Sequence, residues 1–190
     1  MAKVKLNPVV EHMRGQIGEL VFRKAFGKIF VGRKADPGEH EPSAGQLEVR
    51  ERFRAAALYG RMAMADPAAR ELYDDAAGKK GKPVFAMVMA DFLNAPSIDE
   101  VDVSEYTGAQ GSPIYVRTED DFTVTRVHVS ITSPDGTQLE SGDAALELGG
   151  TGRWVYLGSS SIPAGTDVRI SVTVTDKPGS TAVMDTEKRV

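Results

Sequence analysis

The chain has 190 residues, of which 41% are hydrophobic and 26% charged, a composition that suits one large or two small folded domains. It contains no cysteine, which excludes disulfides and thiolate metal ligands. The net charge of −4 is unevenly distributed, because residues 1–90 hold 16 Lys and Arg against 11 Asp and Glu, whereas residues 91–190 hold 7 against 16. We therefore expect a basic domain over residues 1–96 and an acidic domain over residues 97–190.

The N-terminus lacks the apolar run and the small-residue cleavage site of a secretory signal. We expect synthesis in the cytoplasm, with the final location open between the cytoplasm, a virion-like particle and non-classical export. The longest apolar run, Val84–Ala90, is too short to cross a bilayer, so no membrane insertion is expected.

The first regular elements expected are two β-strands, Leu20–Lys24 and Ile29–Arg33, joined by a turn over Ala25–Lys28. A lone two-stranded hairpin is barely stable in water. We therefore expect the hairpin to pack on the helices that follow or on another chain. The residues predicted to contact a partner are Leu20, Val21, Phe22, Arg23, Lys24, Ile29, Phe30, Val31, Arg33 and Lys34.

Three helices are predicted after a Pro- and Gly-containing linker over residues 35–45. The first spans about Gln46–Met64, and helical spacing favours an inward stripe of Leu47, Phe53, Ala57, Leu58 and Met62. The second begins at the N-cap Asp66 and Pro67, runs to about Ala77 with Leu72, Tyr73 and Ala76 inward, and is stopped by Gly78-Lys79-Lys80-Gly81. The third spans about Pro83–Asn94, with Val84, Phe85, Val88, Met89 and Phe92 inward.

The remainder of the chain alternates with period two between turn signals, which predicts an antiparallel β-sandwich. Strands are expected over Ile114–Arg117, Val124–Ile131, Arg153–Leu157 and Val168–Val174, with a last one within residues 180–190. The residues predicted to face the core are Val127, Val129, Ile131, Trp154, Tyr156, Val168, Ile170, Val172 and Val174. The expected fold class is thus α+β, with a β-hairpin and three helices followed by a sandwich.

From about Val101 to Val190 the chain resembles bacterial immunoglobulin-like or fibronectin-III-like domains. The resemblance rests on Asp121–Val124, Asp135-Gly136, Trp154-Val155-Tyr156 and Val172–Gly179, although the cysteine pair of antibody domains is absent. It implies an Ig-like sandwich that serves as a spacer, an adhesive unit or an assembly module. The opening Gly15-x-x-Gly18-x-Leu20-Val21-Phe22-Arg23 is similar to that of uncharacterised bacterial and prophage proteins, from which no catalytic role carries over.

No catalytic set is visible, so we expect that the protein is not an enzyme and needs no cofactor. None of the three histidines, His12, His40 and His128, accompanies a nucleophile motif, and Ser159-Ser160-Ser161 is more simply a polar loop. Glu119-Asp120-Asp121 and Asp176 can meet at one pole of the sandwich, and carboxylates suit Ca²⁺. Their spacing matches no known calcium loop, so the interpretation adopted is a solvated acidic turn without a metal.

A structural subunit that associates with copies of itself is the function that these features favour most. The hairpin would pair by strand addition, and its basic residues would face an acidic patch of another copy at Asp120, Asp121, Asp143 and Glu147. The alternative is a nucleic-acid-binding protein that uses the basic half. Gly78-Lys79-Lys80-Gly81 resembles the Gly-x-x-Gly loop of KH domains, so Lys79, Lys80 and Lys82 are the candidate contacts.

Overall fold

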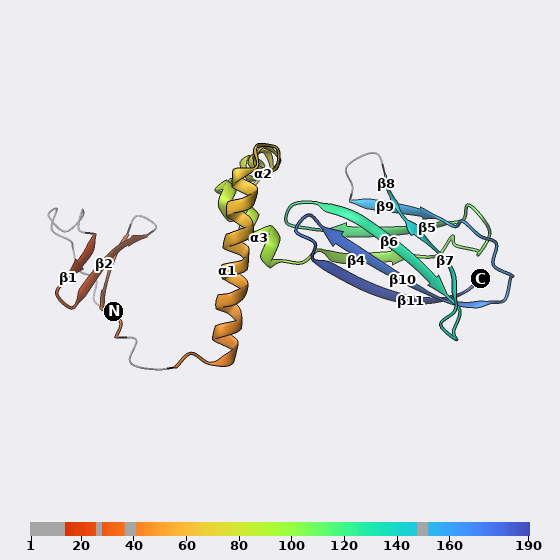
Figure 1. Ribbon diagram of the computed structural model, residues 1–190, viewed down its shortest axis with the longest axis horizontal. Coiled ribbons are helices and arrows are strands. Elements are labelled where there is room, and N and C mark those ends of the chain that lie inside the picture. Colours follow the sequence, from red (N-terminus) through yellow and green to blue (C-terminus); the bar gives the residue numbers. More distant parts are fainter. Residues whose placement is uncertain (1–13, 26–27, 37–40, 148–151) are drawn as a thin grey trace. The chain divides into compact units, whose positions relative to one another are not determined.

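A computed structural model describes residues 14–25, 28–36, 41–147 and 152–190 (Figure 1). The chain divides into two compact units, residues 1–44 and 45–190. The first unit holds a small sheet, and the second holds three helices and two further sheets. This is the α+β, two-module architecture expected from the sequence. The boundary expected at residues 96 and 97 falls inside the second unit, between the last helix and the first strand of the sandwich.

The first unit contains an antiparallel sheet of three strands in the order β1-β2-β3. The predicted strands are confirmed as β2, Leu20–Ala25, and β3, Lys28–Arg33. The sequence prediction missed β1, Gly15–Ile17, which pairs with β2 through a tight turn. Gly18 in that turn has a φ of 60°, a conformation that glycine adopts without strain.

Three helices begin the second unit: α1, Ala44–Ala65; α2, Pro67–Lys80; and α3, Val84–Leu93. The predicted start of α2 is confirmed, because the Asp66 side chain accepts a hydrogen bond from the backbone N–H of Ala68. Its predicted end is wrong by about one turn. Gly78, Lys79 and Lys80 are helical, and the helix closes at Gly81, which has a φ of 63°.

The predicted inward stripe of α1 is largely wrong. Leu47, Phe53, Leu58 and Met62 are each about half exposed or more, and the buried residues are Ala56, Gly60 and Ala63. Small residues let another element approach the helix axis closely, and a Cβ atom on Gly60 would lie 2.8 Å from the Phe85 ring. Figure 1 shows that the N-terminal part of α1 extends past α2 and α3, so large side chains there have no cover from them.

Tyr73 of α2 and Met87 and Val88 of α3 form the centre of the helical core. Tyr73, Val88 and Met89 are buried as predicted, whereas Leu72 and Phe85 are exposed, contrary to prediction. None of the helices in the described part of the chain has the length and hydropathy needed to span a membrane.

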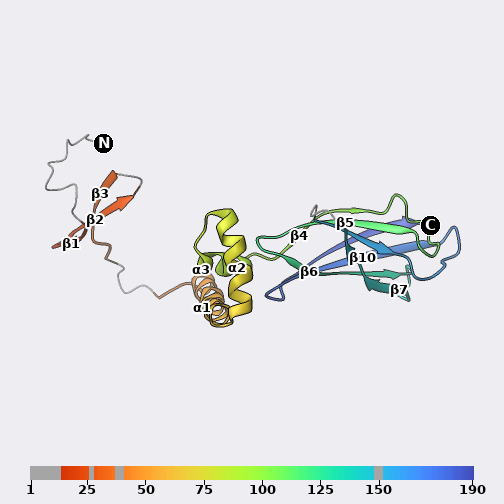
Figure 2. The same ribbon diagram turned by 90° about the horizontal axis from the view of Figure 1, so that it is seen from above.

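The remaining eight strands form two antiparallel sheets of four strands (Figures 1 and 2). One sheet has the order β11-β10-β6-β7 and the other β4-β5-β9-β8. Their bounds are β4 Ser97–Asp102, β5 Pro113–Glu119, β6 Val124–Thr132, β7 Gln138–Asp143, β8 Ala145–Leu146, β9 Arg153–Leu157, β10 Asp167–Asp176 and β11 Thr181–Arg189. Strand β10 pairs along its length with both β6 and β11, which makes it a central strand of its sheet.

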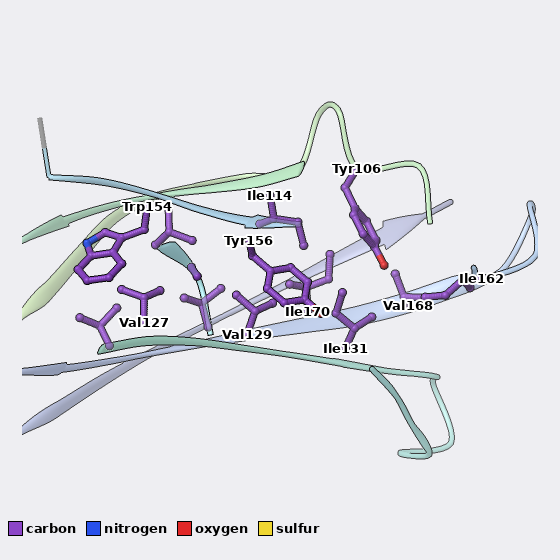
Figure 3. Close-up of a cluster of buried hydrophobic side chains, with 14 residues drawn as sticks. Tyr106, Ile114, Val127, Val129, Ile131, Trp154, Tyr156, Ile162, Val168 and Ile170 are labelled. Atoms are coloured by element: carbon purple, nitrogen blue, oxygen red, sulfur yellow. The ribbon is translucent and has the colours of Figure 1, made fainter. Parts of the chain in front are cut away.

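Alternate residues of these strands point between the two sheets and form one hydrophobic core (Figure 3). All nine residues predicted to face the core are buried, with exposed fractions of 9% or less. The core also contains Tyr106, Ile114, Val116, Ala144 and Ile162. The C-terminal half is therefore a β-sandwich, as its period-two alternation predicted.

A buried carboxylate, Glu140 of β7, connects three segments of the sandwich. Its Oε1 accepts from the hydroxyl of Tyr106 at 2.7 Å, and its Oε2 accepts from the backbone N–H groups of Ser159 and Ser160, both at 2.7 Å. The Ser159 hydroxyl also donates to Oε2, at 3.0 Å. Ser159 and Ser160 thus serve as hydrogen-bond donors that hold Glu140.

Candidate functional site

The N-terminal sheet has one predominantly apolar side. Residues directly opposite each other in antiparallel strands share a face, and the register sets Ile17 opposite Leu20 and Phe22 opposite Val31. With Ile29, these residues make a surface that we call the apolar face. Ile17 is 56%, Leu20 44% and Val31 51% exposed, and Phe22 and Ile29 are partly exposed.

The basic residues predicted for the same surface lie around it and on its reverse side. Lys24 is paired with Ile29, and Arg33 is paired with Leu20. These two basic residues therefore lie on the same side of the sheet as the apolar face, at its edges. Arg23 lies on the reverse side opposite Phe30, which is 53% exposed, and Val21 shares that side. Lys34 follows β3, where its backbone N–H donates to Glu19. All four basic side chains are exposed.

The acids predicted to form the complementary patch lie at three places in the sandwich. Asp120 and Asp121 are neighbours in the β5–β6 loop, Asp143 ends β7, and Glu147 follows β8. Three of them pair with cations of their own chain: Asp121 with Lys80 at 3.7 Å, Asp143 with Arg126 at 2.9 Å, and Glu147 with Arg153 at 3.6 Å. Asp143 also contacts His128 at 2.7 Å, and the hydrogen bonds with His128 and Arg126 lower the pKa of its carboxyl group.

The lysines proposed for phosphate binding do not lie in one loop. Lys79 and Lys80 belong to the last turn of α2, and Lys82 follows the Gly81 cap. The Lys80 ammonium also donates to the backbone carbonyl of Asp121, so this lysine helps to hold α2 against the sandwich. The resemblance to a KH loop is therefore wrong for this segment, because a helical turn replaces the loop.

A group of three carboxylates lies where the helices meet the sandwich. It consists of Asp91 of α3, Asp120 of the β5–β6 loop and Asp176 at the end of β10, with one carboxylate oxygen of each within 4.8 Å of the other two. We call it the aspartate cluster. Asp91 is 0% and Asp176 2% exposed, and Asp120 is partly buried.

Each carboxylate of the aspartate cluster is held through one oxygen. Asp176 Oδ1 accepts from the N–H groups of Gly179 at 2.7 Å and Ser180 at 2.6 Å, and Asp120 Oδ2 accepts from Phe122 at 3.4 Å. Asp91 Oδ2 accepts from the Tyr73 hydroxyl, which lies 3.1 Å from the Tyr59 hydroxyl. The second oxygen of each carboxylate is buried and has no hydrogen-bond partner among the residues that the structure describes.

Burial and mutual repulsion change the acidity of this cluster. Burial raises the pKa of Asp91 to about 7, assisted by the negative charges of Asp120, Asp176 and Asp121 and opposed by the Tyr73 hydrogen bond. Burial also raises the pKa of Asp120. The ring of Phe122 stacks on Tyr73 with centroids 4.1 Å apart, so an apolar contact borders the cluster.

Sequence reasoning found half of this arrangement. It predicted that Glu119, Asp120 and Asp121 can meet Asp176 at one pole of the sandwich, and of these Asp120 and Asp176 do come together. It missed Asp91 and assigned Asp121 to the group, whereas Asp121 contacts Lys80 and Asn94. The sequence does contain a signal for Asp91, because it is the one charged residue in the otherwise apolar sequence of α3. His12 and His40 lie outside the described residues.

Comparisons with known proteins support no family assignment. No family model matches the chain, and no curated protein matches it. Among solved structures, CopC from Methylosinus trichosporium OB3b aligns with a TM-score of 0.37 and 14% identity over 48% of this chain and 89% of that chain. A tetra-tandem repeat in the extending region of a large adhesion protein aligns with a TM-score of 0.35 and 17% identity, covering 50% of this chain and 23% of that chain.

Proposed function

We propose that this protein is a non-enzymatic structural subunit that associates with further copies of itself through its N-terminal sheet. The observation that carries the proposal is the apolar face, of which Ile17, Leu20 and Val31 are about half exposed. A sheet of three short strands needs a hydrophobic face packed against something to be stable. A second copy of the chain packs against the apolar face. Folding of the sheet is then coupled to assembly.

Charge favours a contact between unlike surfaces of the two copies. The basic residues around the sheet repel their counterparts in a symmetric sheet-to-sheet contact, whereas residues 91–190 carry 7 Lys and Arg against 16 Asp and Glu. We infer that the sheet of one copy meets the sandwich of the next. Such head-to-tail contacts build rings, filaments or lattices.

The edge of the sandwich at β8 is the acceptor that we favour for strand addition. Among the residues that the structure describes, strand β8 has two residues, which pair with Val155 and Trp154 of β9, and Glu147 after it donates to the Arg153 carbonyl. Leu146 on this edge is 53% exposed, and Asp143 and Glu147 flank it. A basic strand such as β3 that adds to this edge would form backbone hydrogen bonds with β8. Its cationic side chains would lie near Asp143 and Glu147. The C-terminal domain then acts as an Ig-like assembly module.

The test measures association of the full chain by sedimentation velocity and electron microscopy. We expect concentration-dependent oligomers that weaken at high salt, because salt screens the charged part of the contact. Val31→Asp places a charge in the apolar face and is expected to give a monomer. Val183→Asp is the matched control, because Val183 is a strand residue of the sandwich that is 62% exposed against 51% for Val31, and this variant is expected to assemble normally.

A wild-type chain that stays monomeric at high concentration and low salt contradicts the proposal. Equal loss of assembly in both variants contradicts the assignment to the apolar face. Nucleic-acid binding is the second candidate, supported by the exposed basic residues of the N-terminal sheet. It lacks the predicted phosphate loop, since Gly78–Lys80 are helical.

A further inference from the structure

We propose that the aspartate cluster binds a divalent cation of the hard, oxygen-preferring class, with Ca²⁺ as the expected ion. The inference is independent of self-association, since all three residues belong to the second unit of the chain. It rests on the geometry of the three carboxylates, on their unpartnered oxygens and on the type of ligand that they offer.

The spacing of the carboxylates suits one ion. Ca²⁺ binds oxygen at about 2.3–2.6 Å, so two ligands on opposite sides of the ion lie up to about 5 Å apart. One oxygen from each of Asp91, Asp120 and Asp176 lies within 4.8 Å of the other two. Three segments that are distant in sequence therefore bring their carboxylates to the separation that a shared ion requires.

The unpartnered oxygens indicate that something positive is bound there. In the described part of the chain, Asp91 Oδ1, Asp120 Oδ1 and Asp176 Oδ2 are buried without a hydrogen-bond donor, although buried polar atoms in folded proteins are almost always paired. In each carboxylate the other oxygen accepts a hydrogen bond that orients the group. Each side chain is thus fixed by its own chain and presents one bare oxygen.

Nearby side-chain cations do not neutralise the cluster. Within the described part of the chain, none of the three carboxylates forms an ion pair. Lys80 is directed to Asp121, and the Lys177 ammonium lies 5.9 Å from the ring centroids of both Tyr73 and Phe122. Three adjacent carboxylates in a buried place repel one another, and a divalent cation removes most of that repulsion.

The ligand type selects the class of metal. The cluster offers carboxylate oxygens without thiolate or imidazole, which favours Ca²⁺, Mg²⁺ or Mn²⁺ over Zn²⁺ or Cu²⁺. Ca²⁺ accepts irregular geometry and a high coordination number, whereas Mg²⁺ demands a near-regular octahedron at about 2.1 Å. Water molecules complete the coordination shell. The ion would tie α3 to the β5–β6 loop and to β10, and so fix the helices on the sandwich.

The experiment uses the full chain, stripped with EDTA, dialysed and titrated with CaCl₂. We expect the unfolding temperature to rise by about 5 °C or more once Ca²⁺ exceeds its dissociation constant a hundredfold. Terbium luminescence excited through tyrosine gives a second reading, because Tyr73 touches Asp91. We expect Tb³⁺ emission that added Ca²⁺ abolishes.

Asp91→Asn and Asp120→Asn each remove one negative charge from the cluster and are expected to weaken Ca²⁺ binding at least tenfold. Asp120 is partly exposed, so Asp120→Asn keeps the test valid if Asp91→Asn fails to fold. Asp185→Asn, at an exposed position of β11, is the matched control and is expected to bind as the wild type does. If Ca²⁺ leaves the wild-type unfolding temperature unchanged and Tb³⁺ emission is equal in all variants, the cluster does not bind the ion and the proposal is wrong.

Discussion

Glu140 shows how a single buried side chain holds distant segments of the sandwich. Its carboxylate is 5% exposed and accepts hydrogen bonds from Tyr106, Ser159 and Ser160. Burial, followed by the hydrogen bond and the charge of Glu140, raises the pKa of the Tyr106 hydroxyl, so this group remains a donor at neutral pH. No sequence pattern announced this role, because Glu140 lies on an edge strand where an acid normally faces water.

Replacing Glu140 with alanine is expected to lower the free energy of unfolding by about 3 kcal/mol, since it leaves several buried donors without an acceptor. Denaturant unfolding followed by the fluorescence of Trp154, which lies in the sandwich core, measures the change. Glu187→Ala is the control, because Glu187 makes an exposed pair with Arg169 at 3.2 Å, and its loss is expected to change stability by less than about 1 kcal/mol. Equal effects of the two substitutions would contradict the structural role of Glu140.

Asp91 gives the metal-free protein a specific dependence on pH. Because its pKa in the folded state is about 7, against 3.8 in an unfolded chain, the folded state binds a proton that the unfolded state releases between these values. The contribution of Asp91 to stability is therefore complete below about pH 4 and is lost as the pH rises through 7. Carboxyl groups with lowered pKa values, such as Asp143, act in the opposite direction.

In EDTA, the free energy of unfolding of the wild type relative to Asp91→Asn is expected to fall by a few kcal/mol between pH 4 and pH 8. The groups that face Asp91 are Tyr73 from α2, Asp120 and Asp121 from the β5–β6 loop, and Asp176 from β10. These groups are present in both proteins, so the difference reports the titration of Asp91 together with its coupling to them. Denaturant titrations at each pH provide the measurement, and a difference that is independent of pH would show that Asp91 titrates normally.

The sequence predicted the buried faces of the strands that it identified more accurately than the buried faces of the helices, although it did not predict β1, β4, β7 or β8. In β6 and β10 one side of each strand faces the second sheet, so alternation identifies the buried residues directly. In α1 the largest apolar residues suggested the buried face, yet Ala56, Gly60 and Ala63 make the contact. Close helix packing selects small residues, and a helix that extends past its neighbours leaves Val49 and Phe53 exposed.

The end of α2 can be tested with two glycines three residues apart. Gly78 is helical and Gly81 has a φ of 63°, and a Cβ atom on either meets no other atom within 4 Å. Gly78→Ala is expected to raise the free energy of unfolding by up to about 1 kcal/mol through helix propensity. Gly81→Ala is expected to lower it by about 1 kcal/mol, because alanine is strained in the left-handed conformation.

Thermal unfolding followed by circular dichroism at a helical wavelength compares the two variants. Each serves as the control of the other, since the same side chain is added in the same segment. If both substitutions destabilise the protein, the helical placement of Gly78 is contradicted, and if both stabilise it, the left-handed conformation of Gly81 is contradicted.

Across the whole molecule, the sequence predicted the helices and the sheets. It predicted only part of the aspartate cluster, which lies where the helices meet the sandwich. The β-sandwich, the helices and the basic sheet each have a local pattern, whereas the aspartate cluster combines Asp91 with Asp120 and Asp176 through tertiary packing. The proposed assembly face follows from local pattern as well, because the alternation of β2 already separates Leu20 and Phe22 from Val21 and Arg23. The structure adds that Ile17, Leu20 and Val31 of this face are about half exposed.

The hydrogen bonds to Glu140 have one further consequence. They hold the β4–β5 loop and the β9–β10 loop against strand β7 without any covalent link, and the chain has no cysteine to oxidise. These hydrogen bonds are therefore expected to persist in the presence of thiol reagents or glutathione. The same holds for peroxide at levels that do not oxidise methionine. The sandwich is therefore expected to fold equally well in oxidising and in reducing surroundings.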